Sequence, residues 1–374
     1  MKSLKIEFKL RSASAYYLTD HRDRIHPLPF RCNGRGGIVH CQYTTFGATE
    51  SRRSDAVTKK TVKPRKKGLK GRDFLSVDDF SPAEIRSVLV LARDMKAHPR
   101  KYRAALEGAM MALIFEKPSL RTRTTFTVGI KQLGGDALLL TPADINLGKR
   151  ESVYDVAKNL ERMVDGIMIR TFGHDICTSL AAHAAIPVIN GLTDLEHPCQ
   201  AMADFMTIIE CRKNLAKAKI AYVGDGNNVA HSLLLMAGKL GATLFVGTPE
   251  KYKPDQNVMD RAVALARENG GTIVWTSSPV EAVHNADVVY TDTWASMGQE
   301  AEAEQRREEF NSYQVNRGLF SHAHGDALFM HCLPAHRGWE VTDEIMDSKN
   351  SVVFQEAENR LHAQKAIMVG LLKG

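Results

Sequence analysis

Short apolar runs alternate with stretches of helical periodicity from about residue 81 onward. The run 109–115 has no polar position and is typical of a parallel strand buried on both faces. Ser81, Pro82 and Glu84 form a helix start, with a cap, a first-turn proline and a third-position acid. The alternation predicts an α/β fold of parallel sheets covered by helices on both faces. The expected strands are 109–115, 136–140, 166–170, 187–190, 219–223, 243–246, 272–275, 288–290, 328–330 and 352–354.

The same pattern predicts two doubly wound domains, because a break in the alternation falls at a long helix near 199–214. A sequence of 374 residues is long enough for two such cores. We expect the first domain at 72–205 and the second at 206–357. An amphipathic closing helix at 358–374 is expected to return to the first domain and complete it.

Residues 1–71 differ from the rest in charge. They hold 17 Lys and Arg against five acids, so the net charge of +7 hides a mildly acidic body. A sequence pI near 9 is therefore no argument for nucleic-acid binding. The basic segment resembles an organellar transit peptide followed by a disordered linker, and the alternative is a disordered tail that stays attached. We expect a plastid stroma or mitochondrial matrix location, with the cytoplasm as the alternative.

The sequence disfavours a membrane-spanning protein, a disulfide or zinc protein, and a dinucleotide-binding enzyme. No run of apolar residues reaches the length of a membrane span. The six cysteines include no Cys-x-x-Cys, which favours free thiols in a reducing compartment over disulfides or a zinc site. The turn Gly224-Asp-Gly-Asn-Asn228 starts like a dinucleotide motif, but Val229 stands where the third glycine belongs. A nicotinamide oxidoreductase is thus possible but disfavoured.

Unusual polar residues follow the expected strands at their carboxyl ends, where doubly wound folds place their sites. After the first strand, Ser119 and the two arginines beyond it start a helix, which is the arrangement of an anion site. Taken singly, each has an ordinary interpretation: a capped helix with solvated arginines, a structural histidine, a buried thiol or a capping aspartate. Six such groups on one rim favour a functional site: Ser119 to Thr122, Arg170, His197 to Gln200, Asn227 and Asn228, Asp292 to Gly298, and His331 to Pro334.

From about residue 73 onward the sequence resembles the ornithine transcarbamylases of the aspartate/ornithine carbamoyltransferase superfamily. Leu120 departs from the family pattern, in which many members have threonine. The resemblance implies transfer of a carbamoyl group from carbamoyl phosphate to ornithine, giving citrulline and phosphate, at a site in the cleft between two domains. It rests on Ser119-Leu-Arg-Thr-Arg123, His197-Pro-Cys-Gln200, Gly224-Asp-Gly-Asn-Asn228, Asp292-Thr-Trp-Ala-Ser-Met-Gly298, His331-Cys-Leu-Pro334 and Glu358-Asn-Arg360.

The resemblance also implies residue roles. It places carbamoyl phosphate on Ser119, Leu120, Arg121, Thr122, Arg170, His197, Gln200 and Arg360. It places ornithine on Asn228, Asp292, Ser296, Met297 and Cys332. The catalytic residues it implies are Cys332, Asp292, His197, Arg121 and Arg170.

No cofactor or metal is implied, and the expected partners are the two small substrates and further copies of the chain in a homotrimer. The loop around Lys149 is expected to reach into a neighbouring subunit. Two alternatives stay open, a carbamoyltransferase for N-acetylornithine, putrescine or aspartate, and a non-catalytic homologue.

Overall fold

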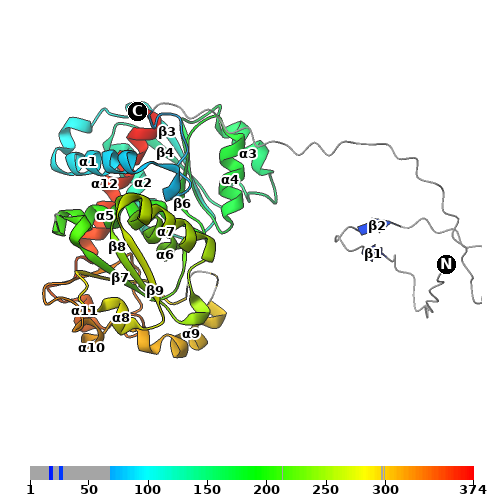
Figure 1. The fold of residues 1–374 in the computed structure, drawn as a ribbon. Helices are drawn as coiled ribbons and strands as arrows, with labels where there is room; N and C mark the ends of the chain where they lie inside the picture. Colours follow the sequence, from blue (N-terminus) through cyan, green and yellow to red (C-terminus); the bar gives the residue numbers. More distant parts are fainter. Residues whose placement is uncertain (1–16, 20–24, 28–67, 213, 296–297, 299) are drawn as a thin grey trace, which may run out of the picture. The chain divides into compact units, whose positions relative to one another are not determined.

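The computed structural model describes residues 17–19, 25–27, 68–212, 214–295, 298 and 300–374 (Figure 1). The chain divides into two compact units, residues 1–62 and 63–374. In the first unit, strands β1 (Tyr17–Thr19) and β2 (Ile25–Pro27) pair antiparallel. Residues 68–71 of the predicted disordered segment are also described, and there the Gly71 N–H donates to the Leu371 carbonyl at 2.7 Å. The other residues of that segment lie outside the described residues. The second unit carries every motif singled out above.

The first sheet of the second unit has four parallel strands in the order β4-β3-β5-β6. Its central strand is the apolar run of the sequence, and five of its six residues are buried. Phe115 lies opposite Arg170 in the register of β3 and β5, so the carboxyl ends of these two strands lie side by side. The strands are β3 (Met110–Phe115), β4 (Asp136–Leu140), β5 (Gly166–Arg170) and β6 (Val188–Leu192).

The second sheet has five parallel strands in the order β11-β10-β7-β8-β9. Thr291 lies opposite His331 in the register of β10 and β11. The next residues, Asp292 and Cys332, therefore leave the sheet as neighbours. The strands are β7 (Lys219–Val223), β8 (Thr243–Gly247), β9 (Thr272–Thr276), β10 (Val288–Thr291) and β11 (Leu328–His331).

Helices connect successive strands and cover both sheets (Figure 1), as expected for parallel pairing. The α-helices are α1 (Pro82–Ala97), α2 (Leu120–Gln132), α3 (Val153–Leu160), α4 (His174–His183), α5 (Pro198–Arg212), α6 (Asn228–Leu240), α7 (Gln256–Asn269), α8 (Pro279–Val283), α9 (Ala303–Glu309), α10 (Arg317–Phe320), α11 (Asp343–Met346) and α12 (Val353–Leu372). The short 3-10 helices are η1 (Val77–Asp79), η2 (Pro99–Tyr102), η3 (Leu215–Lys217), η4 (Glu250–Tyr252), η5 (Glu300–Glu302) and η6 (Asn311–Tyr313).

The predicted fold class, two parallel-sheet α/β domains, is confirmed. One hydrophobic cluster runs through both domains by way of the buried faces of α5 and α6. The predicted boundary at 205/206 lies inside α5 and stays a prediction. None of the helices in the described ranges is long and apolar enough to cross a bilayer.

One expected strand is wrong. Residues 352–354 do not extend the second sheet, because α12 begins at Val353, five residues before the expected helix start. The neighbouring Ser351 makes only an isolated bridge to Phe329. Val353 is buried against the second domain, so the apolar pair at 352–353 is the start of a helix and not a strand. From there α12 runs back to pack against α1, α2 and α5.

Candidate active site

The first part of the site is the N-terminus of α2, directly after β3. Ser119 has an extended backbone and its hydroxyl accepts the Thr122 N–H at 3.2 Å. The N–H groups of the first helical turn have no intrahelical partner and carry the positive end of the helix dipole. The Leu120 side chain, which replaces the family's threonine, is 77% exposed. This end of the helix can bind an anion.

Three guanidinium groups surround that helix end. Burial and the nearby charges of Arg360 and Arg121 together lower the pKa of Arg170 to about 10. Burial also lowers the pKa of Arg121 and of Arg360. Within the described residues, no carboxylate forms an ion pair with Arg121 or Arg170, and Arg170 Nε is buried without a partner. The site is therefore electropositive.

Arg360, on α12, is held by two neutral partners. Its Nη2 donates to Thr122 Oγ1 at 2.8 Å, and its Nη1 donates to Gln200 Oε1 at 2.7 Å. Gln200 in turn donates through Nε2 to Asp204 Oδ1 at 2.7 Å and to Glu356 Oε1 at 3.2 Å. The structure thus brings together the predicted Thr122, Gln200 and Arg360. Two acids that the sequence interpretation did not select complete this network.

His197 lies at the start of α5 and is 4% exposed. Its backbone N–H donates to Ser232 Oγ at 2.8 Å, and its ring Nδ1 is buried without a partner. Burial and the three arginines lower the pKa of His197 well below its ordinary value. The ring is therefore neutral at physiological pH, and it can donate one N–H to a substrate oxygen.

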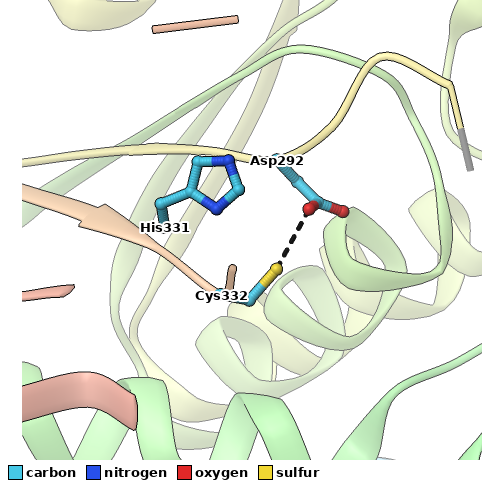
Figure 2. Close-up of side chains that lie close together, drawn as sticks. All are labelled: Asp292, His331 and Cys332. Atoms are coloured by element: carbon cyan, nitrogen blue, oxygen red, sulfur yellow. Dashed lines mark hydrogen bonds between the residues drawn. The ribbon is translucent and has the colours of Figure 1, made fainter. Parts of the chain in front are cut away.

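Asp292 and Cys332 meet where β10 and β11 end (Figure 2). Cys332 Sγ donates to Asp292 Oδ1 at 3.0 Å, and Asn227 Nδ2 donates to Asp292 Oδ2 at 2.8 Å. Burial and the adjacent carboxylate raise the pKa of Cys332 well above its ordinary value. Cys332 is therefore a protonated thiol and not a thiolate, since burial and the adjacent Asp292 both disfavour the thiolate.

His331 lies beside this pair, and one ligand atom of each of the three residues falls within 4.8 Å of the others (Figure 2). Such a cluster resembles a metal site by composition. However, His331 Nδ1 accepts the Leu333 N–H at 2.9 Å and Nε2 lies 3.2 Å from Glu340 Oε1. Both ring nitrogens are engaged, so a metal would have to break one of these contacts. The expected absence of a metal stays a prediction.

Of the remaining residues predicted to bind ornithine, only Asn228 lies among the described residues. Asn228 is half-buried, and its Nδ2 donates to the Thr193 carbonyl at 2.6 Å. Ser296 and Met297 lie outside the described residues. The neighbouring Asn227 belongs to the predicted rim but was given no role, and its side chain caps α6 and holds Asp292. Its position as the first polar residue after the glycine turn was the available signal.

Two family descriptions cover most of the chain. The profile "Aspartate/ornithine carbamoyltransferase, carbamoyl-P binding domain" matches residues 72–210. The profile "Aspartate/ornithine carbamoyltransferase, Asp/Orn binding domain" matches residues 216–371. The first match contains α2 and His197, and the second contains Asp292, Cys332 and α12.

Individual relatives agree with these profiles. An ornithine carbamoyltransferase of Thermococcus kodakarensis is 54% identical over 82% of this chain and 98% of its own length. One from Anoxybacillus flavithermus is 52% identical over 81% of this chain and 98% of its own length. The solved ornithine carbamoyltransferase of Pyrococcus furiosus superposes with a TM-score of 0.80 at 51% identity, covering 82% of this chain and 99% of that one.

These relatives overturn the predicted location. They come from archaea and bacteria, whose cells have no plastid or mitochondrion. The organellar prediction is therefore wrong, and the relatives support the cytoplasmic alternative. The basic composition of residues 1–71 was the reason for the error, because composition alone does not distinguish a transit peptide from another basic extension.

The relatives also decide between the interpretations that the residues left open. Aspartate/ornithine carbamoyltransferase profiles cover both domains, and the named relatives are ornithine carbamoyltransferases at more than half identity. The predicted transferase activity, with ornithine as acceptor, is confirmed. The chain belongs to the aspartate/ornithine carbamoyltransferase family, in its ornithine carbamoyltransferase branch.

Proposed function

We propose that this carbamoyltransferase carries out its reaction where α2, β5 and α12 face the Asp292–Cys332 pair. The observation that carries the proposal is the convergence of three guanidinium groups on one helix N-terminus, two of them without a carboxylate partner in the described chain. Cys332 and Asp292 are close enough to Arg121 to raise its pKa electrostatically. The residues proposed for the phosphate and those proposed for the ornithine amine are therefore neighbours.

Carbamoyl phosphate would bind with its phosphate at α2. Ser119, the backbone of Leu120 to Thr122, and the Arg121 side chain would hold the phosphate oxygens. Arg170 would bridge the phosphate and the carbonyl oxygen. His197, Arg360 and Gln200 would contact the carbamoyl group, with Gln200 accepting a hydrogen bond from its amide through the second lone pair of Oε1.

The reaction forms a bond between the ornithine side-chain nitrogen and the carbamoyl carbon, and it breaks the bond from that carbon to the phosphate oxygen. The side-chain ammonium of ornithine first loses one proton to solvent to become the free amine. As the new bond forms, the attacking nitrogen loses a second proton, and phosphate leaves with the bonding electron pair and can accept that proton. Negative charge grows on the carbonyl oxygen and on the leaving group. Fixed arginines and a neutral His197 N–H stabilise that charge without reorganising, which is the main catalytic contribution of such a site.

The acceptor end would use Asp292. Its two oxygens accept from Cys332 and Asn227, and an anionic carboxylate has further capacity for the ornithine cation. Asp292, Asn228, Ser296 and the backbone of Met297 would bind the α-amino and carboxylate groups. Asp292 and Cys332 would also face the side-chain amine. Because the thiol is protonated here, we assign Cys332 to orienting Asp292, and not to removing the proton from the amine.

We further propose a homotrimer in which the loop around Lys149 reaches the site of a neighbouring subunit. Lys149 and Arg150 are exposed, and they lie on the same domain as the anion helix. Their charge would suit a phosphate-binding site. Analytical ultracentrifugation of the whole chain tests the assembly, and a monomer that keeps full activity would contradict it.

The experiment that tests the site is Arg121→Ala. A charge-assisted hydrogen bond contributes about 1.5–3 kcal/mol, so the KM for carbamoyl phosphate should rise at least about tenfold. Turnover should fall as well, since leaving-group charge grows in the transition state. Lys131→Ala is the matched control, because Lys131 lies on the same helix and pairs on the surface with Asp136. Unchanged carbamoyl phosphate kinetics in folded Arg121→Ala would place the phosphate elsewhere.

A further inference from the structure

Two fully buried carboxyl groups, Asp204 on α5 and Glu356 on α12, lie behind Gln200. Gln200 Nε2 donates to both of them, at 2.7 Å and 3.2 Å. The Tyr290 hydroxyl lies 3.3 Å from Asp204 Oδ2 and 3.2 Å from Glu356 Oε1. Glu356 Oε2 also accepts the His331 N–H at 3.0 Å. No assigned role in the reaction accounts for these two acids.

The two carboxyl groups share two partners, Gln200 Nε2 and the Tyr290 hydroxyl, so they lie side by side. Burial raises the pKa of Asp204 to about 7 and raises the pKa of Glu356 well above its ordinary range. The charge of Arg360 opposes this rise at Asp204. Burial and mutual repulsion therefore favour a protonated carboxyl group in the pair at neutral pH.

This pair fixes which way the Gln200 amide points. Its acceptor-rich surface attracts the NH2 end, which leaves Oε1 facing Arg360 Nη1 at 2.7 Å. A flipped amide would set an oxygen against Asp204 and an NH2 group against the guanidinium, losing both bonds. The orientation passes on through Arg360, whose other Nη donates to Thr122. The two acids, which lie outside the proposed substrate site, thus orient the Gln200 amide and, through it, the Arg360 guanidinium.

We propose that Asp204 and Glu356 are positioning residues that set Gln200 and Arg360 for the carbamoyl end of carbamoyl phosphate. The inference rests on the proposed function, because it takes Gln200 and Arg360 as the contacts of that end. It also explains why two buried acids lie next to an electropositive site. Through the His331 N–H, Glu356 also ties the strand that carries Cys332 to α12.

The test compares variants of Asp204 in two measurements. Asp204→Ala removes the acceptor of the Gln200 bond, and it should raise the KM for carbamoyl phosphate at least about tenfold. Inhibition by inorganic phosphate should change less than about threefold, since phosphate occupies the α2 end and not the carbamoyl end. Asp204→Asn keeps an accepting oxygen and supplies a permanent hydrogen toward Glu356. It should therefore stay within about threefold of the parent in both measurements.

Thr207→Val is the matched control. Thr207 lies one turn further along α5, where it accepts from Asn359 of α12 at 2.8 Å, so it tests the same helix contact without touching Gln200. It should lower the melting temperature and leave the KM for carbamoyl phosphate within about twofold. Asp204→Leu, with similar volume and no acceptor, should match Asp204→Ala and replaces it if that variant does not fold.

Three results would overturn the inference: normal carbamoyl phosphate kinetics in folded Asp204→Ala or Asp204→Leu, phosphate inhibition weakened in parallel, or Asp204→Asn as impaired as Asp204→Ala. Arg121→Ala, measured alongside, separates this failure from a failure of the proposed site. If Arg121→Ala weakens carbamoyl phosphate binding and Asp204→Ala does not, only the positioning role is lost. If neither weakens it, the site itself is misplaced.

Discussion

Replacing Arg170 by methionine should make the ligand-free protein more stable and the enzyme much weaker. Arg170 is 6% exposed, and the cations Arg360 and Arg121 lie close to it. An uncompensated buried charge is costly, whereas an apolar side chain of similar length suits the same surroundings. The positive charge of the site therefore lowers the stability of the folded protein, and a bound anion would offset this loss.

The magnitude follows from the pKa. Burial and the neighbouring cations lower the pKa of Arg170 to about 10, from an ordinary value above 12. At about 1.4 kcal/mol for each tenfold change, the charged form costs ~3 kcal/mol in the folded state. Because the folded-state pKa lies below the unfolded one, this cost is fully present at neutral pH. It disappears only as the pH rises above about 10.

Differential scanning calorimetry with and without carbamoyl phosphate measures both effects. Arg170→Met should raise the ligand-free melting temperature by roughly 5 °C, because a few kcal/mol shifts a chain of this size by several degrees. The stabilisation on adding carbamoyl phosphate should be lost, and the KM should rise by about tenfold or more.

The matched control is Arg212→Met. Arg212 donates to Asp326 at 2.7 Å and to the Asp287 carbonyl at 3.1 Å, so its charge is compensated. Its replacement should lower the melting temperature and leave the kinetics unchanged. A lower ligand-free melting temperature for Arg170→Met, as in the control, would refute the reasoning.

Three further predictions concern the acceptor end and His197. Cys332→Ser keeps a donor to Asp292 and should retain most activity, whereas Cys332→Ala should lower turnover and raise the ornithine KM. A destabilised Cys332→Ala with normal ornithine kinetics would reduce the thiol to packing. If Asp292 and Ser296 read the α-amino group, ornithine should be used far better than putrescine, and equal rates at equal concentration would contradict this. The His197 ring, followed by NMR of labelled histidine, should titrate well below the ordinary histidine range because its pKa is lowered. A normal titration would mean that water and not the three arginines surrounds it.

The sheets could be predicted from the sequence because buried parallel strands are continuous apolar runs, and these need no partner information to recognise. Residues 166–170 and 219–223 are such strands with the predicted bounds. The edge strand 136–140 also has its predicted bounds, although none of its residues is buried. The run at 352–354 shows the limit. A short apolar run fits a strand or a buried helix start equally well, and only the packing of Val353 decides between them.

Site residues were predictable where they lie in contiguous motifs at strand ends. In the first sheet the register of β3 and β5 brings Arg170 beside the strand that leads to Arg121. In the second sheet the register of β10 and β11 brings Asp292 beside Cys332. Asp204 and Glu356 could not be found this way. Each is an acid in a helix and looks like part of a solvated face, and their meeting depends on how α12 packs on α5.

The course of α12 has a consequence for synthesis on the ribosome. Arg360 follows Thr122, its partner in the site, by 238 positions. At about 5–20 residues per second, the β3–α2 region emerges roughly 12–48 s before α12 is made. During that interval the surface of α2 at Gly129 lacks the side chains of Lys365 and Met368, which lie against it in the folded protein. The nascent first domain is thus catalytically incomplete, and its exposed apolar surface is a natural target for chaperones until the segment after residue 352 is available.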